Sequence, residues 1–347
     1  MRSNIGRRTV RLAIAVAVAG LSAASLARPT LAEGYDDGLM SKYNEALKGK
    51  KVAFVPISMS FDIPQVYALG MQAQAKAMGY SFEVRDPNWK VDDAVQAVNQ
   101  LIQEKPDVIV VQPFDSKALD RTVRKAQEAG IMWLWTNVKT TENGDAYVGN
   151  NYFKQGSLEV QIAADRCGAG TSQKIAIVES PPNISSTIGY MAGITDALKA
   201  HPELKLVATQ TAEADASKAK SIAATILKQH PDLCAFIGLW DGEDIGIPPA
   251  VQEAGLTGKV NVITVGAGSQ VSACDLVAKG AFTAYVSYDV ADQVHSINDA
   301  IATLLQQRLK PGSHPFALYT HEKVLTKDTL QPGSCWNMDD EKKLVLH

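Results

Sequence analysis

The sequence predicts an α/β protein made of two Rossmann-like, doubly wound lobes with parallel sheets. From residue 50 to residue 309, short apolar segments alternate with amphipathic stretches, which is typical of βαβ units. The alternation restarts near residue 150, so it forms two similar runs rather than one. At 347 residues the chain exceeds the roughly 150 residues of an average domain. Its 46% apolar content is sufficient for two cores.

The first run alternates four predicted strands with three predicted helices. The segment DVIVVQP is almost wholly apolar and β-branched, as expected of a strand buried on both faces. The helix that precedes it repeats apolar residues at helical spacing, and a glycine follows the first helix. In chain order, the predicted elements are strand 50–56, helix 64–79, strand 81–85, helix 92–104, strand 107–113, helix 116–129 and strand 131–136.

The second run repeats this pattern over a longer stretch. It begins with a helix at 151–166 and ends with a long helix at 289–309. The predicted strands between them are 174–180, 204–210, 234–240, 260–266 and 282–288, and the helices are 184–199, 215–229, 243–255 and 270–279. An eight-stranded barrel is the structural alternative. It would need one continuous cycle, and the different segment lengths around 147–151 disfavour it.

The N-terminus is typical of a secretory signal peptide. Arg7 and Arg8 precede the apolar run 12–26, and a small-residue cleavage motif ends at Ala32. The apolar run is too short for a bilayer span of about 20 residues. We therefore expect residues 1–32 to be removed and the mature protein to lie in the periplasm. The remaining 315 residues carry 29 basic and 37 acidic side chains, which disfavours nucleic acid as a partner.

The four cysteines all lie in the predicted mature chain, at positions 167, 234, 274 and 335. An oxidising compartment permits disulfides, and four cysteines allow three pairings. Buried free thiols are the alternative. The wide spacings do not indicate a metal site, and none of the six histidines has metal-ligand spacing. We expect neither a metal nor a cofactor.

Two segments resemble a known family. The stretch 86–131 ends in Ala-Gly-Ile after a strand–helix–strand–helix pattern, and the stretch 228–255 begins with a His-Pro-Asp turn before a strand and a helix. Together they resemble the periplasmic substrate-binding proteins of sugar ABC transporters, of the ribose/galactose-binding type. The resemblance covers about residues 48–325. It implies two lobes joined by three crossing segments, with the ligand in the cleft between them.

The resemblance also implies where the lobes divide. The N-terminal lobe is expected to comprise 48–149 and 289–317, and the C-terminal lobe with its tail 150–288 and 318–347. Hinge residues are expected at Asn150, Asn151 and Asp289. The family returns its tail to the second lobe, so a disulfide between Cys274 and Cys335 is favoured over one between Cys167 and Cys234.

Candidate binding residues follow the predicted strands. In open α/β sheets, ligands bind beyond the carboxyl ends of the strands. Aromatic faces and hydroxyl-binding polar groups at those ends suit a sugar or polyol. The ligand-binding candidates are Phe61, Asp62, Trp135, Asn137, Tyr190, Trp240, Asp241 and Tyr288. For Trp135, a place in the core is an equally good interpretation.

The candidate site departs from the family pattern in its charges. Asn137 stands where relatives carry an acid, Trp240 where they carry an amide or acid, and Ile188 where they carry an arginine. No arginine occurs between Cys167 and Gln307. The pocket should therefore be less charged and more aromatic than a hexose site, which favours a polyol, a deoxy sugar or another small ligand over an ordinary aldohexose.

Three other functions compete with that of a solute receptor. An enzyme is disfavoured because 57–65 contains no glycine of a dinucleotide-binding turn, and no GxSxG motif occurs. A transcription regulator would need a DNA-binding head where the signal segment stands. A ligand sensor that presents to a chemoreceptor or sensor kinase remains compatible. The prediction is a monomeric receptor that delivers a sugar or polyol to an ABC permease.

Overall fold

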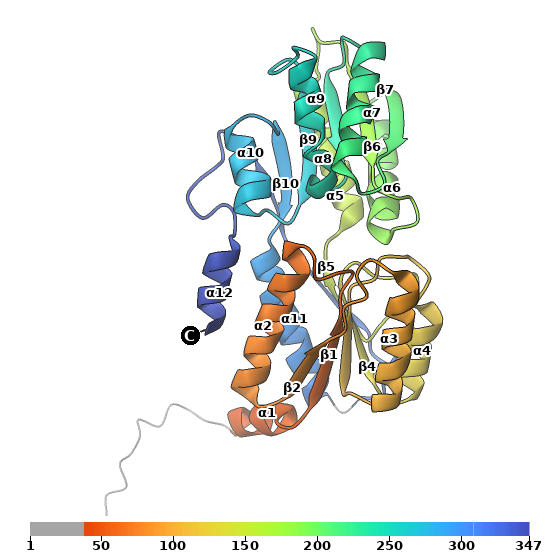
Figure 1. Ribbon diagram of the computed structural model, residues 1–347, viewed down its shortest axis with the longest axis vertical. Helices are drawn as coiled ribbons and strands as arrows, with labels where there is room; N and C mark the ends of the chain where they lie inside the picture. The colour runs from red at the N-terminus through yellow and green to blue at the C-terminus, as the bar shows by residue number, and fades with distance from the viewer. Residues whose placement is uncertain (1–37, 308, 347) are drawn as a thin grey trace, which may run out of the picture. The chain divides into compact units, whose positions relative to one another are not determined.

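The computed structural model describes residues 38–307 and 309–346, which form two six-stranded sheets with helices on their faces (Figure 1). The predicted signal peptide lies outside the described residues. Within the described part of the chain, no helix combines the length and the apolar character that a bilayer span requires. The predicted α/β class with two doubly wound lobes is confirmed.

The first sheet has the strand order β11-β5-β4-β3-β1-β2, and all its pairings are parallel. Its strands are β1 (Lys51–Val55), β2 (Ser81–Val84), β3 (Val108–Val111), β4 (Met132–Asn137), β5 (Ala146–Gly149) and β11 (Phe316–Tyr319). The sequence analysis did not predict β5 or β11. Both have only four residues, and three of the four in β11 are exposed, so both are shorter than the strands predicted for this sheet.

Alternation along the central strands supplies both faces of this sheet. In β1, Val52 and Phe54 belong to one core, and Ala53 and Val55 belong to the core on the opposite face, as a period of two requires. Helices α2 (Asp62–Met78) and α11 (Val290–Gln306) pack against each other, as do α3 (Val91–Glu104) and α4 (Asp120–Glu128). The short helix α1 (Leu39–Leu47) precedes β1.

The second sheet has the order β12-β10-β9-β8-β6-β7 and is parallel except for β12. Its strands are β6 (Lys174–Glu179), β7 (Lys205–Thr211), β8 (Ala235–Gly238), β9 (Asn261–Gly266), β10 (Ala284–Tyr288) and β12 (Glu322–Leu325). Its larger helices are α5 (Tyr152–Arg166), α6 (Ser185–Ala200) and α7 (Ala216–Gln229). β12 is a four-residue edge strand that the sequence analysis did not predict.

Two predicted helices of this lobe are divided. The stretch 243–255 forms α8 (Asp241–Asp244) and α9 (Ile247–Glu253). Prolines in the first turn of α9 lack the N–H groups that would continue the preceding helix. The stretch 270–279 begins as the π-helical turn η1 (Gln270–Cys274) and continues as α10 (Asp275–Ala278).

The chain passes between the two sheets after β5, after β10 and after β11. A buried polar cluster joins these three crossings. The Gln293 side-chain amide donates to Asn150 Oδ1 and, at 3.0 Å, to Thr320 Oγ1, and the Tyr67 hydroxyl donates to Gln293 Oε1. Because each residue belongs to a different segment, the cluster fixes the crossings relative to one another.

The C-terminal tail contacts both lobes. Trp336 is bound to the second lobe, because its indole Nε1 donates to the Ala267 carbonyl at 2.8 Å. The following helix α12 (Met338–Leu346) instead contacts α2 of the first lobe. The tail therefore makes a fourth link between the sheets.

The structure contains two disulfides. Cys274 pairs with Cys335, which the sequence analysis favoured, and Cys167 pairs with Cys234, which it ranked lower. The first bond ties the tail to η1. The second joins the end of α5 to the start of β8. The two bonds stabilise different parts of the second lobe, so the favoured pair is present and the lower-ranked pair forms beside it.

Candidate functional site

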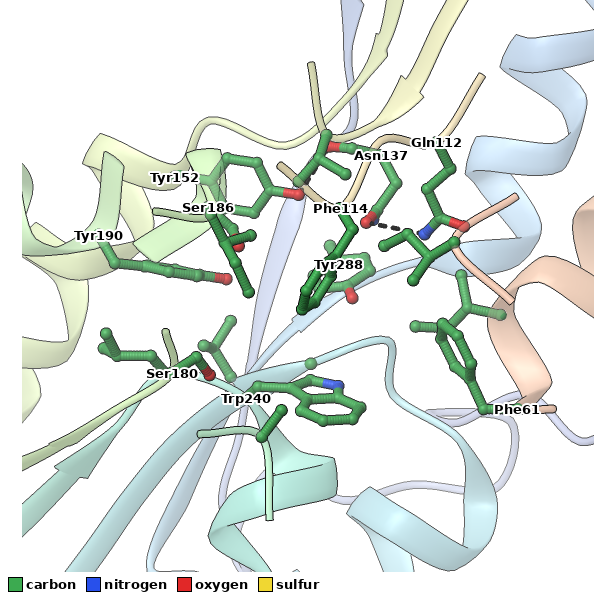
Figure 2. A pocket seen from close by; sticks show the side chains of 18 of the residues that line it. Phe61, Gln112, Phe114, Asn137, Tyr152, Ser180, Ser186, Tyr190, Trp240 and Tyr288 are labelled. Carbon is green, nitrogen blue, oxygen red and sulfur yellow. Dashed lines mark hydrogen bonds between the residues drawn. The ribbon is translucent and has the colours of Figure 1, made fainter. Parts of the chain in front are cut away.

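A pocket of about 660 Å³, part of it open to solvent, lies at the carboxyl ends of the strands of both sheets (Figure 2). Residues from both lobes line it: Ile57, Phe61, Ile63, Trp89, Gln112, Phe114, Asn137, Val138, Tyr152, Ser180, Ile184, Ser186, Tyr190, Ala214, Leu239, Trp240, Val265, Gly266 and Tyr288. This is the position expected for a ligand site in open α/β sheets.

Aromatic rings from three loops of the first lobe form one wall. Phe61, which precedes α2, stacks on Trp89 with a centroid distance of 5.2 Å. Phe114, which follows β3, meets Trp89 edge to face at 5.6 Å. The Trp89 backbone is left-handed, with φ of 68°, and its indole Nε1 donates to Ser60 Oγ at 3.0 Å. The wall is thus held by ring packing and by a hydrogen bond.

Trp240 brings an aromatic ring from the second lobe. It follows β8 and caps α8, and its backbone N–H donates to Asp244 Oδ2 at 3.0 Å. Its ring lies 6.3 Å from that of Phe61, edge to face, across the lobes. A Cβ on Gly242 would lie 2.4 Å from the Trp240 ring. Glycine at 242 therefore leaves the space that this orientation of the indole requires.

Two buried amides from the first lobe form a polar corner. Gln112 Nε2 donates to Asn137 Oδ1 at 3.3 Å, drawn as a dashed line in Figure 2. Gln112 Oε1 and Asn137 Nδ2 are left without a hydrogen-bond partner within 3.5 Å, although the Asn137 side chain lies near enough to the hydroxyls of Tyr67 and Tyr288 to oppose the rise of their pKa. The corner therefore offers one acceptor and one donor side by side.

The backbone of Asn137 is held in an unusual conformation. Its φ is 61°, a region that costs energy for residues other than glycine. Two tyrosine hydroxyls donate to its carbonyl, that of Tyr147 at 2.9 Å and that of Tyr152 at 2.6 Å. These bonds hold the backbone of Asn137 in this conformation.

Tyrosines and serines supply the rest of the polar lining. The Tyr190 hydroxyl donates to Gln155 Oε1 at 2.9 Å, and Ser180 Oγ donates to Glu243 at 3.3 Å. Burial raises the pKa of Tyr190 and Tyr288, so both stay protonated at physiological pH. Figure 2 shows Ser180, Ser186 and Tyr190 on the side of the pocket opposite Gln112 and Asn137.

None of the pocket-lining residues in the described chain carries a charged side chain. Acidic groups lie behind the second-lobe wall. Asp241 accepts hydrogen bonds from Ser272 and Tyr285, each at 2.7 Å, and burial raises its pKa. Burial also raises the pKa of Glu243 to about 7. The surface that faces a ligand is thus neutral, with carboxyl groups underneath.

The structure brings five of the predicted binding residues into the pocket and leaves three outside it. Those in the lining are Phe61, Asn137, Tyr190, Trp240 and Tyr288. Asp62 is exposed at the start of α2 and Asp241 is buried behind Gly266, so neither belongs to the lining.

The binding role predicted for Trp135 is corrected. Its ring packs on Trp133 at 4.9 Å and its Nε1 donates to the Glu142 carbonyl, inside the core between the sheet and α3. Residues i and i+2 of a strand share a face, so Trp135 had to follow Trp133 into that core.

Sequence reasoning missed several lining residues: Trp89, Gln112, Phe114, Tyr152 and Ser180. Gln112, Phe114 and Ser180 occur at or just after the carboxyl end of a predicted strand, which was an available signal. Trp89 was harder to find, because it depends on a left-handed loop after β2.

The predicted hinge residues lie at the crossings in different environments. Asn150 is buried in the polar cluster with Gln293. Asn151 is exposed and caps α5, accepting from the Lys154 N–H at 3.0 Å. Asp289 caps α11 and pairs with Lys323 at 2.5 Å.

Comparison with known proteins finds one matching family and several similar proteins. The model of the periplasmic binding protein domain matches residues 52–309. The chain is 27% identical to a D-ribose/D-allose-binding protein of Pseudomonas aeruginosa over 65% of this chain and 73% of the relative. It is 28% identical to a D-allose-binding periplasmic protein of Escherichia coli K12 over 64% of this chain and 74% of the relative.

Solved structures agree with the fold. A glucose-galactose binding protein from Geobacillus stearothermophilus is 21% identical, with a TM-score of 0.72 over 82% of this chain and 99% of that one. A periplasmic solute-binding protein of an ABC transporter from Actinobacillus succinogenes, with bound D-allose, is 25% identical, with a TM-score of 0.68 over 80% and 98% of the two chains.

Proposed function

Because the chain belongs to the periplasmic binding protein family, we propose that it is the solute receptor of an ABC importer and captures a small hydroxylated ligand. The ligand class is a sugar, a deoxy sugar or a polyol. Relatives at 27% and 28% identity carry names that include ribose and allose binding, which supports this class. The proposed receptor performs no covalent chemistry.

The observation that carries the proposal is the composition of the pocket. Seven aromatic side chains and a buried pair of amides face one space between two lobes. Aromatic faces pack on the C–H groups of a sugar ring, and amides bind its hydroxyls. Such a receptor needs no catalytic groups, because it releases its ligand unchanged.

The proposed mechanism is a shift between open and closed lobes. A ligand that contacts Gln112 in one lobe and Trp240 in the other stabilises the arrangement in which both contacts form. The three crossings near Asn150, Asp289 and Thr320 would absorb the rotation. The closed form would be recognised by the membrane subunits of the permease. Export and cleavage near Ala32 would place the receptor in the periplasm.

Thermal denaturation of the exported protein against sugars, polyols and small acids tests the proposal. A true ligand at 100 times its Kd should stabilise the protein by about 2.7 kcal/mol. Phe153, an exposed aromatic residue of α5 outside the pocket, provides the control: Phe153→Ala should keep the full ligand-induced shift. If no sugar or polyol raises the Tm, the ligand class is wrong.

A further inference from the structure

Much of the hydrogen-bonding capacity around the pocket is already used within the protein. The Tyr152 hydroxyl donates to the Asn137 carbonyl at 2.6 Å, and the Tyr190 hydroxyl donates to Gln155 at 2.9 Å. Ser180 donates to Glu243 at 3.3 Å. A hydroxyl has one hydrogen to donate. These three lining side chains therefore have no proton left for a ligand oxygen.

The polar corner holds the clearest hydrogen-bonding atoms that remain available to a ligand. Gln112 Oε1 and Asn137 Nδ2 are buried without partners, while the bond between Gln112 Nε2 and Asn137 Oδ1 holds the two amides together. One ligand hydroxyl can accept from Asn137 Nδ2 and donate to Gln112 Oε1. Since buried polar groups are costly when unpaired, this corner selects ligands that place a hydroxyl there.

The aromatic wall, by contrast, favours apolar groups of a ligand. Phe61, Trp89, Phe114 and Trp240 line the same space. Their contacts with one another, at centroid distances of 5.2 to 6.3 Å, leave apolar surface for a ligand. A ligand hydroxyl placed against the faces of these rings would lose water without gaining a hydrogen bond. A methyl group there would be favourable instead.

Charge restricts the ligand further. No charged side chain lines the pocket in the described chain, and the buried Asp241 lies directly behind Gly266. An anionic ligand would lose its hydration without meeting a cation, and it would lie near this carboxyl group. A neutral ligand has neither cost.

Resting on the proposed function, we infer that the receptor selects uncharged sugars in which at least one hydroxyl is replaced by an apolar group. Deoxy sugars and O-methyl glycosides belong to this class. The retained hydroxyls bind at the Gln112–Asn137 corner, and the apolar substituent lies against the wall of Phe61, Trp89, Phe114 and Trp240. Selectivity thus comes from the unpaired polar atoms of the corner on one side of the pocket and from the apolar ring faces of the wall on the other.

Isothermal titration with matched pairs of sugars tests the inference. The probes are D-fucose against D-galactose, L-rhamnose against L-mannose, and methyl β-D-glucopyranoside against D-glucose. In at least one pair the apolar member should bind tenfold or more tightly than its parent. D-galacturonate tests the charge rule and should not bind, and choline, a cation that is not a sugar, tests the proposed function.

The outcomes separate the inference from the proposed function. If the parent sugars bind as tightly as their apolar partners, or if a charged probe such as D-galacturonate binds best, the inference is overturned and the sugar receptor stands. If none of these sugars binds, the inference is overturned. If, in addition, choline binds and no sugar or polyol raises the Tm in the thermal screen, the proposed function fails together with the inference.

A substitution in the corner gives a second readout. Gln112→Met keeps the side-chain length and removes the acceptor, so the best-binding sugar should lose at least tenfold in affinity. Gln161→Met, at a glutamine of α5 outside the lining, should bind like the wild type. Unchanged binding by a folded Gln112→Met protein would overturn the role of the corner.

Discussion

At the scale of single residues, Trp240 carries the clearest prediction. Its indole faces the pocket and is only partly buried, so Trp240→Ala should remove ligand contact without opening the core. We expect the affinity for the best ligand to fall at least tenfold, about 1.4 kcal/mol, while the Tm of the ligand-free protein changes little. Titration calorimetry and thermal denaturation of the same variant measure both quantities.

Trp133 provides the comparison variant for Trp240. That residue is fully buried, so Trp133→Ala should lower the free energy of unfolding by about 3–5 kcal/mol. The ligand affinity of the remaining folded molecules should be unchanged. A Trp240→Ala protein that instead behaved like this would show that Trp240 is a packing residue.

Glu159 predicts a dependence of stability on pH. Both carboxylate oxygens are buried without partners, and burial and then the nearby Asp244 raise its pKa well above the ordinary value. The folded state therefore keeps a proton that the unfolded state releases near pH 4.5. This contribution to stability is complete below that pH and is lost progressively as the pH rises towards the folded-state pKa.

Glu159→Gln removes that titration. The variant should be more stable than the wild type at pH 8, and this advantage should shrink at pH 4.5, as measured by urea unfolding at the two pH values. Glu253→Gln, at an exposed side chain paired with Lys220, is the control and should show no such difference. An equal effect of Glu159→Gln at both pH values would contradict the account.

The candidate site was predictable from the sequence only in part. Position after a strand identified Phe61, Asn137 and Trp240, because strand ends converge in this fold. It could not separate Trp135 from the core, since that depends on which face of β4 each side chain takes. Nor could it find Trp89, whose place depends on a left-handed backbone.

At the scale of elements, the buried strands and long helices were readable because their apolar spacing is strong. The edge strands β11 and β12 were not, because each has only four residues and mostly exposed or half-buried side chains. The division between α8 and α9 was visible in principle, since prolines occupy the first turn of α9. Local signals therefore described the centre of each sheet better than its edges.

The tail gives a prediction at this scale. The Cys274–Cys335 disulfide and the Trp336 hydrogen bond hold the segment that leads to α12. The double variant Cys274→Ser with Cys335→Ser should lose about 2–4 kcal/mol of stability. Limited proteolysis should cleave it between β12 and α12 faster than the wild type. Equal cleavage rates would mean that the disulfide does not hold the tail.

At the scale of the whole molecule, the two lobes followed from the restart of the strand–helix pattern, whereas their linkage did not. The buried cluster of Asn150, Gln293 and Thr320 joins residues up to 170 positions apart, which no local pattern reveals. The contact of α12 with α2 is equally long-range. Such links arise only once both lobes have formed.

Export of the protein gives a prediction at the scale of the whole molecule. Protein recovered from the periplasm of a Gram-negative expression host should begin at Glu33, because the apolar run 12–26 and the small residues before the expected cleavage point match the pattern of a signal peptide. Mass spectrometry of the intact protein measures this. A full-length chain retained in the cytoplasm would contradict the predicted localisation.

The central claim is that one neutral ligand binds between the lobes and contacts both. A crystal structure of the protein with its tightest sugar tests it most directly. The account predicts a sugar whose hydroxyl meets Gln112 and Asn137 of the first lobe and whose apolar face lies on Trp240 of the second. A sugar bound outside this pocket, or bound in it through one lobe alone, would contradict the account.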